Sequence, residues 1–271
     1  MTTLHAIVLG IIEGITEFLP ISSTGHLMLA STLLKLQQTE FQKSFEIIIQ
    51  LGAILSVVVL YWKKLWEWGT IKKLIAAFVP TAVLGALFYK IVKGYLLNSN
   101  LTVLWALFLG GVFLVGFEWW YGRREGILPR QPADQNDSAA VANSNEIENI
   151  SYQKSFIIGL FQSLAMIPGV SRSAATIVGG LILGLKRKTI VEFSFLLAVP
   201  TMLAASVLDL CKSAGSFVGA DWGALAVGFI VSFVVAIGVI KWLLHFIQKH
   251  SFIGFGIYRI LVSIAFWLVL W

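Results

Sequence analysis

The sequence has few charged residues and almost no cysteine. Charged residues make up 13% of the 271 residues, whereas hydrophobic residues make up 58%. A soluble domain carries roughly a quarter charged residues, so this composition predicts an integral membrane protein. The single cysteine, Cys211, excludes an internal disulfide and a cysteine metal cluster. No Lys or Arg precedes the first apolar run, which Glu13 and Glu17 interrupt, so we expect no cleaved signal peptide.

What the sequence has instead is aromatic and basic residues. It contains 10 Trp and 19 Phe, as expected for aromatic belts and lipid-facing surfaces. The formal net charge is +6. In a membrane chain such an excess fits basic cytoplasmic loops, and no nucleic-acid motif is present, so we expect no nucleic-acid partner.

Residues 3–34 are apolar but are broken in the middle by Pro20 and its neighbouring hydroxyls. Each half is too short to cross roughly 30 Å of hydrocarbon, which requires about 20 helical residues. A turn at membrane depth is tolerated where it lies inside protein or lines a polar cavity. We therefore predict a re-entrant helical hairpin at 3–34 within a first repeat, 1–124, whose membrane spans are 45–62, 74–92 and 101–121.

The second half has the same plan after a polar segment. Residues 125–151 are rich in Pro, Asp, Asn and Ser and predict a flexible linker. Residues 152–184 are again apolar and are broken by Pro168 and Gly169. The sequence predicts a second repeat, 152–271, with a re-entrant hairpin at 152–184 and spans at 190–210, 223–244 and 252–271.

These elements predict an all-α polytopic membrane protein with an internal repeat. An offset of 149 residues places Gln162 on Glu13 and Arg172 on Ser23. A hairpin returns to its own side and three spans cross, so the second repeat must be inverted, as in many transporters. Thirteen Lys and Arg residues fall on one predicted face and five on the other, which puts both termini on the outer side.

The first hairpin carries two carboxylates, Glu13 and Glu17. At a spacing of four residues they share one helix face, where like charges repel. Carboxylates in a bilayer are costly and mark functional sites. Their charge can be compensated by a divalent cation held by oxygen ligands, by Arg172, or by a proton retained on one of them.

Hydroxyl groups follow at the point where the second half-helix should begin. Ser22, Ser23 and Thr24 can cap this helix or bind an anion at its N-terminus. His26 lies three residues after Ser23 on the same predicted face, a spacing that suits a base activating a nucleophile.

The second hairpin supplies the complementary chemistry. Arg172 lies in the middle of an apolar hairpin and needs an anionic partner, and its planar fork matches phosphate or carboxylate. Further donors at this half-helix are Ser171, Ser173 and Thr176. Glu46 and Gln50 are either supports behind the carboxylate pair or interfacial residues. Together the two hairpins predict a phosphate site at bilayer depth, for a lipid headgroup or a transported anion.

Four segments carry a resemblance to a known family. They are residues 13–26 (EGITEFLPISSTGH), 45–52 (FEIIIQLG), 168–176 (PGVSRSAAT) and 192–200 (EFSFLLAVP). With them the whole chain resembles the undecaprenyl-diphosphate phosphatases, also known as bacitracin-resistance proteins. The family's glutamate-rich motif falls on Glu13 and Glu17 and its arginine-serine motif on residues 171–173. One departure is Ala174, where we expect glycine.

The resemblance implies a bacterial inner-membrane enzyme that removes the terminal phosphate of undecaprenyl diphosphate. The monophosphate is then reused for cell-wall precursor export, and loss of the diphosphate confers bacitracin resistance. The resemblance also implies a divalent cation, Mg²⁺ or Ca²⁺, and a homodimer. Combined with the residues above, it places Glu13 and Glu17 on the metal, Arg172 and the hydroxyls on phosphate, and Ser23 as nucleophile.

Several alternatives stay open at this stage. Either Glu17 or His26 can act as the base, and water can attack directly with Ser23 only a ligand. A lipid flippase or anion transporter could use the same phosphate site, since inverted repeats occur in transporters. A second superfamily of lipid phosphatases requires His six residues after the Arg of its Ser-Arg motif, where this chain has Val178.

Overall fold

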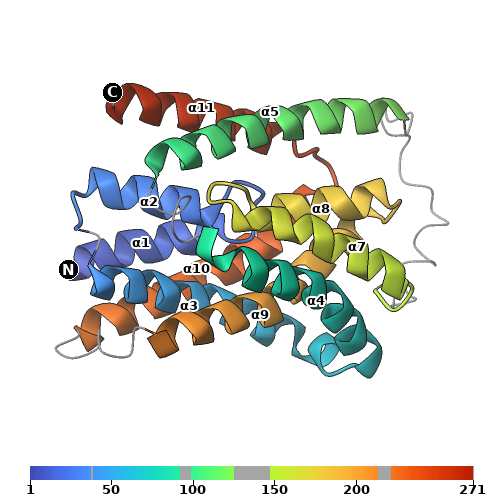
Figure 1. The fold of residues 1–271 in the computed structure, drawn as a ribbon, viewed down its shortest axis with the longest axis horizontal. Coiled ribbons are helices and arrows are strands. Elements are labelled where there is room, and N and C mark those ends of the chain that lie inside the picture. Colours follow the sequence, from blue (N-terminus) through green and yellow to red (C-terminus); the bar gives the residue numbers. More distant parts are fainter. Residues whose placement is uncertain (38, 92–98, 125–146, 213–220, 271) are drawn as a thin grey trace.

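The computed structural model describes residues 1–37, 39–91, 99–124, 147–212 and 221–270, and these residues form helices joined by short turns (Figure 1). The first half contains α1 (Thr3–Thr16), α2 (Ser23–Leu33), α3 (Glu40–Leu65), α4 (Trp68–Ile91) and α5 (Asn100–Arg124). The second half contains α7 (Tyr152–Ser163), the 3₁₀ turn η2 (Leu164–Met166), α8 (Arg172–Ile182), α9 (Arg187–Lys212), α10 (Trp222–Phe246) and α11 (Ile253–Leu270).

The long helices make this chain a polytopic all-α membrane protein. In the described part of the chain, five helices are long and apolar enough to cross a membrane, namely α3, α4, α5, α9 and α10. The sixth predicted span coincides with α11, which has 18 residues and so lies near the lower limit of roughly 17–25 for a spanning helix. Most of the predicted linker 125–151 lies outside the described residues, and the inversion of the repeats stays a prediction.

Short paired helices occupy the positions of both predicted hairpins. α1 and α2 are separated by a turn that contains Pro20, and Ser22 has a φ of 73° there. α7 and α8 are separated by a turn in which Gly169 has a φ of 92°. Hydroxyls cap the helices that follow, since the Ser22 Oγ accepts from the Gly25 N–H at 3.4 Å and the Ser171 Oγ from the Ala174 N–H at 3.1 Å.

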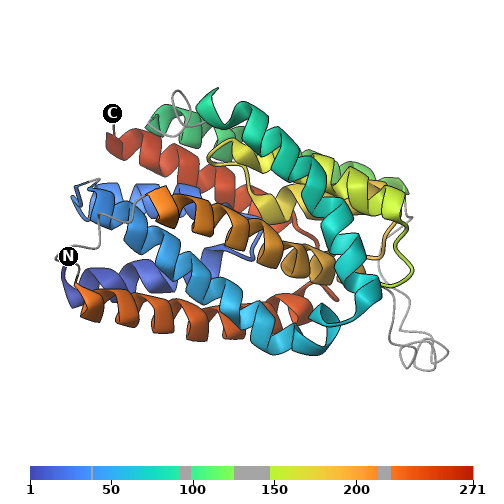
Figure 2. The same ribbon diagram turned by 60° about the horizontal axis from the view of Figure 1, so that its bottom comes forward.

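Helices of one half pack mainly against helices of the other. α1 and α3 lie against α10, α4 lies against α7 and α9, α3 lies against α9, and α5 pairs with α11. Glycine permits close contacts between these helices; for example, a Cβ on Gly14 would lie 2.7 Å from the Ser232 carbonyl oxygen of α10. By chain order, α1 corresponds to α7 and α4 corresponds to α10. Since α1 packs on α10 and α7 packs on α4, the contacts follow the pattern that a two-fold relation between the halves would produce. The long contact surfaces bring the two hairpin turns to the middle of the molecule (Figures 1 and 2).

Two spans begin earlier than the predicted positions 45 and 74. α3 begins at Glu40, where the Thr39 side chain caps the helix by accepting from the Gln42 N–H. α4 begins at Trp68, so Lys73 lies within it and donates to the carbonyls of Ile147 and Glu148. The starts of α3 and α4 could not be predicted from the sequence, because charged residues are common both at helix ends and in loops.

Candidate active site

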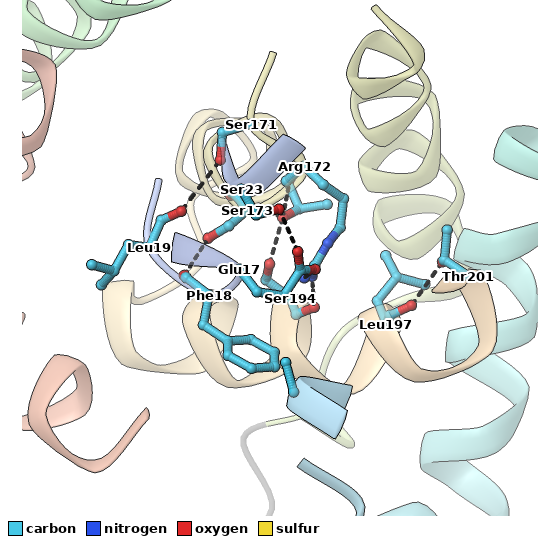
Figure 3. A network of polar contacts seen from close by, with 12 residues as sticks. Glu17, Phe18, Leu19, Ser23, Ser171, Arg172, Ser173, Ser194, Leu197 and Thr201 are labelled. Atoms are coloured by element: carbon cyan, nitrogen blue, oxygen red, sulfur yellow. Dashed lines mark hydrogen bonds and ion pairs between the residues drawn. The ribbon is translucent and has the colours of Figure 1, made fainter. Parts of the chain in front are cut away.

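The turns of the two hairpins are held together by side chain to backbone hydrogen bonds. The Ser173 Oγ donates to the Phe18 carbonyl at 2.8 Å, and the Ser171 Oγ donates to the Leu19 carbonyl at 3.4 Å (Figure 3). These carbonyls belong to the turn after α1, where helical partners are missing. The first residues of α8 therefore satisfy the backbone of the first hairpin and place Arg172 directly beside Glu17.

Arg172 forms an ion pair with Glu17 across the two hairpins. Its Nη2 lies 2.9 Å from the Glu17 Oε1, and the two side chains are only 10% and 3% exposed. Its Nη1 donates to the Ser194 carbonyl of α9 at 2.7 Å. The Arg172 Nε is buried and has no partner among the described residues. The guanidinium is thus fixed at two of its nitrogens and retains a donor at the third.

Glu17 also holds the predicted nucleophile. The Ser23 Oγ donates to the Glu17 Oε2 at 2.6 Å, while the Glu17 Oε1 faces Arg172. One carboxylate therefore connects a hydroxyl from the first hairpin to a guanidinium from the second (Figure 3). A carboxylate within hydrogen-bond distance of a hydroxyl is suited to accept its proton.

Glu13 lies one helical turn before Glu17 and is fully buried. Both of its carboxylate oxygens lack a hydrogen-bond partner in the described part of the chain. An orphaned carboxylate next to a second one is a donor set that suits a hard cation. Among the described residues, no group of three or more His, Cys, Asp or Glu side chains is arranged so that it could hold a metal ion. Mg²⁺ requires only one or two carboxylates where substrate phosphates complete its coordination.

The ring nitrogens of His26 bind other groups than the Ser23 hydroxyl that the sequence spacing indicated. Its Nδ1 lies 2.8 Å from the Ser22 carbonyl oxygen, and its Nε2 lies 3.0 Å from the Tyr258 hydroxyl. Its ring also stacks on that of Tyr258, with centroids 5.5 Å apart. Both ring nitrogens are therefore engaged, and His26 holds the carbonyl of the residue that precedes Ser23.

A cavity of about 540 Å³ adjoins these groups. Its polar wall includes the predicted residues Glu17, Ser22, Ser23, Thr24, Gln50, Ser171 and Arg172. Most of the remaining wall is apolar and comes from α4, η2 and α9, with Phe78, Met166 and Met202 among its residues. The cavity thus combines a polar end for a headgroup with apolar surface for a chain.

Five of the predicted site residues do not line this cavity, namely Glu13, His26, Ser173, Thr176 and Glu46. Ser173 holds the Phe18 carbonyl, and the Thr176 Oγ1 lies 2.6 Å from the Ser194 Oγ. Glu46 accepts from Ser31 at 3.3 Å and from Gln42 at 3.0 Å. These side chains support the elements around the cavity, whereas Gln50 lies in its wall.

Comparison with known proteins identifies the family. The family model described as bacitracin resistance protein BacA matches residues 6–265, which is nearly the whole chain. The chain belongs to this family.

Relatives within the bacitracin-resistance family match over their full length. A protein of Sulfurihydrogenibium sp. named undecaprenyl-diphosphatase is 52% identical over 268 residues, covering 99% of both chains. The Aquifex aeolicus protein of the same name is 48% identical over 267 residues, covering 98% of both chains. A third, from Bdellovibrio bacteriovorus, is 45% identical and covers 100% of this chain and 97% of its own.

Three polar residues at or near the site, Gln162, Asp209 and Arg259, were not assigned to it by sequence analysis. Gln162 lines the cavity and donates to Thr81 at 2.9 Å and to Thr201 at 3.1 Å. Asp209 of α9 also lines it. Arg259 is buried in α11. Its charge inside a predicted span was a signal that could have been used.

Proposed function

We propose that this chain is an integral-membrane phosphatase that hydrolyses undecaprenyl diphosphate to undecaprenyl phosphate and inorganic phosphate. The observation that carries the proposal is the Ser23–Glu17–Arg172 connection, which joins a hydroxyl, a carboxylate and a guanidinium at one cavity. Relatives that are 45–52% identical over the whole chain and are named undecaprenyl-diphosphatase support it. The activity recycles the lipid carrier for cell-wall synthesis and accounts for bacitracin resistance.

The Ser23–Glu17 contact favours a covalent route. The Ser23 Oγ forms a bond to the terminal phosphorus while the bond from that phosphorus to the bridging oxygen breaks. The Ser23 proton passes to the Glu17 Oε2, which lies 2.6 Å away. Undecaprenyl phosphate leaves with the bridging oxygen, and water then cleaves the phosphoserine to release phosphate. Because His26 is engaged at both nitrogens, Glu17 is the better base.

A direct route uses the same base. Water bound beside Glu17 would give up its proton to the carboxylate and attack phosphorus, with Ser23 as a ligand of the phosphoryl group. The covalent route requires that Ser23→Ala lose turnover by several orders of magnitude and that Ser23 become labelled from terminally labelled substrate. Near wild-type turnover of Ser23→Ala would exclude it.

The phosphate ligands follow from the residues that reach the cavity. Arg172 lies in the cavity wall together with Ser22, Thr24 and Ser171. Fixed donors that face the charge developing on the phosphoryl oxygens stabilise the transition state. In this proposal Ser173 and Thr176 position the second hairpin instead of binding phosphate, since neither lines the cavity.

Glu13 and Glu17 are the residues that would hold a divalent cation. The two unpartnered oxygens of Glu13 carry this part of the proposal. The cation, Mg²⁺ or Ca²⁺, would supply positive charge that offsets the charge of the diphosphate oxygens. Arg172 pairs with Glu17 in the cavity wall, whereas Glu13 lies one helical turn before Glu17 and outside the wall.

Location, orientation and assembly complete the proposal. The family supports the bacterial inner membrane, and the resemblance supports a homodimer. Both termini lie at one end of the molecule, whereas the α3–α4 turn, the end of α5 and the start of α7 lie at the other (Figure 1). The basic loops of the second end support a cytoplasmic position for it and an outer position for the termini.

The experiment that tests the proposed function measures phosphate release from undecaprenyl diphosphate by the full chain in detergent. We expect release of inorganic phosphate with formation of undecaprenyl phosphate, and loss of both products with EDTA. Folded protein that releases no phosphate at any Mg²⁺ or Ca²⁺ concentration would contradict the proposal and favour the transporter alternative.

A further inference from the structure

Arg259 of α11 is a buried guanidinium that the mechanism above does not use. It is only 1% exposed and is among the largest fully buried side chains. Within the part of the chain that the structure describes, its hydrogen-bond acceptors are all backbone carbonyls. A charged side chain at membrane depth is costly, so its position calls for a functional explanation.

The carbonyls that Arg259 binds come from both hairpin turns. Its Nη1 donates to the Pro20 carbonyl of the first turn at 3.3 Å, and its Nη2 donates to the Gly169 carbonyl of the second turn at 3.1 Å. Carbonyls that follow a helix lack helical partners and carry partial negative charge. One guanidinium therefore satisfies an orphaned carbonyl in each turn and fixes the two turns at a common point.

The same side chain anchors both turns to α5. The Arg259 Nη2 also donates to the Ala106 carbonyl at 3.0 Å, and its Nε donates to the Leu107 carbonyl at 3.3 Å. Gly110 leaves the space for the guanidinium, because a Cβ there would collide with its Nη2. The paired helices α5 and α11 thus act as a platform on which the turns are placed.

The second turn is seated on this platform by packing as well. A Cβ on Gly169 would lie 2.6 Å from the Val103 carbonyl oxygen and 2.8 Å from the Ala106 Cβ of α5. Tyr258, the residue before Arg259, binds His26 just after the first turn. The consecutive residues Tyr258 and Arg259 of α11 therefore bind groups of both hairpins.

We propose that Arg259 is a positioning residue that ties the two hairpin turns to each other and to α5, so that Ser23 and Glu17 meet Arg172. It does not line the cavity and is separate from the proposed phosphate ligands. Its effect on turnover rests on the proposed function, whereas its effect on the separation of the turns does not. Each consequence has its own measurement.

The first measurement reports the separation of the turns without any turnover. Nitroxide labels on Thr24→Cys and Val170→Cys, in a Cys211→Ser background, report it by continuous-wave electron paramagnetic resonance. Thr24 and Val170 both lie in the cavity wall, one on each hairpin. We expect Arg259→Met to lengthen and broaden the distance distribution, and Arg259→Lys to restore part of the narrow one. A distribution for Arg259→Met equal to that of the wild type would overturn the proposal.

The second measurement is steady-state phosphate release by the unlabelled variants. A misplacement of about 1 Å can cost roughly 10²-fold in rate, so we expect a kcat loss of that order for Arg259→Met and a smaller loss for Arg259→Lys. Because Arg259 does not line the cavity, KM should change by less than about threefold. A rise in KM at unchanged kcat would overturn a positioning role.

Two further variants separate positioning from general packing. Ile260→Ala removes apolar contact of α11 with Gly111 of α5 without touching the turns, and should keep wild-type spectra and kcat. Gly110→Ala places a methyl group against the Arg259 guanidinium and displaces it. We expect this variant to broaden the distance distribution and lower kcat, each to a smaller extent than expected for Arg259→Met. It therefore tests the proposal even if Arg259→Met does not fold. Equal losses in Ile260→Ala would overturn the proposal. Wild-type protein without phosphate release would refute the proposed function alone, because the spectra still decide on Arg259.

Discussion

Replacement of Arg172 tests the link between the two hairpins. The guanidinium binds the Glu17 Oε1 at 2.9 Å and the Ser194 carbonyl at 2.7 Å, and its buried Nε has no partner among the described residues. A lysine ammonium retains the charge but lacks this planar fork. Arg172→Lys therefore keeps the attraction to Glu17 and loses the geometry, whereas Arg172→Met loses both.

The size of the effect can be worked out from these contacts. Each fixed donor to a developing oxyanion contributes about 10²–10³ in rate, so Arg172→Lys should lower kcat/KM by about 10²-fold. An arginine that stabilises a phosphoryl transition state contributes about 10³–10⁵, which sets the expected loss for Arg172→Met. The methionine also leaves the Glu17 carboxylate, 3% exposed, without its counterion. Breaking a buried pair costs about 3–5 kcal/mol of stability.

The assay combines phosphate release with thermal unfolding in detergent. Glu17→Gln together with Arg172→Met should recover part of the lost stability, because neither member of the pair is left as an uncompensated charge, but should recover no activity. Arg187→Met is a control, since Arg187 forms another ion pair, partly buried, at 2.6 Å with Glu118, and neither residue lines the cavity. It should lower stability and keep turnover. Wild-type turnover of Arg172→Met, or inactivity of Arg187→Met, would refute this reasoning.

Further expected outcomes concern Glu13, Tyr258 and Gly14. Glu13→Gln removes a buried, unpartnered carboxylate and should raise the Mg²⁺ concentration for half-maximal activity by at least about tenfold; an unchanged Mg²⁺ titration would remove Glu13 from the metal site. Tyr258→Phe deletes the partner of His26 but keeps the ring stack, so kcat should fall only about threefold to tenfold, as expected for one hydrogen bond of about 1 kcal/mol. A greater loss would give His26 a direct role. Gly14→Leu would collide with the Ser232 carbonyl and should destabilise the protein by about 1–3 kcal/mol in thermal unfolding. An unchanged unfolding temperature would argue against the close contact of α1 with α10.

The fold was largely predictable because its signals are local. Apolar runs of spanning length predicted the long helices. Pro20 and Gly169 marked the turns of the two hairpins, where each run is divided into halves that are too short to cross a membrane. The ends of α3 and α4 were misplaced because Lys and Glu occur at helix ends as well as in loops. These errors moved boundaries without changing the order of the helices.

The site was predictable in its members but not in its pairings. A spacing of three residues predicted that His26 faces Ser23, yet Ser23 begins α2 and turns back to Glu17. Ser22, with its positive φ, makes this reversal possible. Periodicity applies inside a helix and says nothing about contacts across a turn.

Long-range contacts account for the remaining differences. Ser194 and Arg259 bind residues of the hairpins from α9 and α11, far away in the sequence. Ser194 carried no signal, since a serine in an apolar span is common. The charge of Arg259 within an apolar span was a signal of a buried site. Its backbone carbonyl partners could not be predicted, because every turn has carbonyl groups without helical partners.

The most direct test of a site built from both hairpins is phosphate release from undecaprenyl diphosphate by Ser23→Ala, Arg172→Met and their combination. Residues that act as one unit show losses that do not add. We expect each single variant to lose at least about 10³-fold in kcat, and the double variant to be no slower than the slower single one. Wild-type turnover in either single variant, or losses that multiply in the double one, would contradict a shared site.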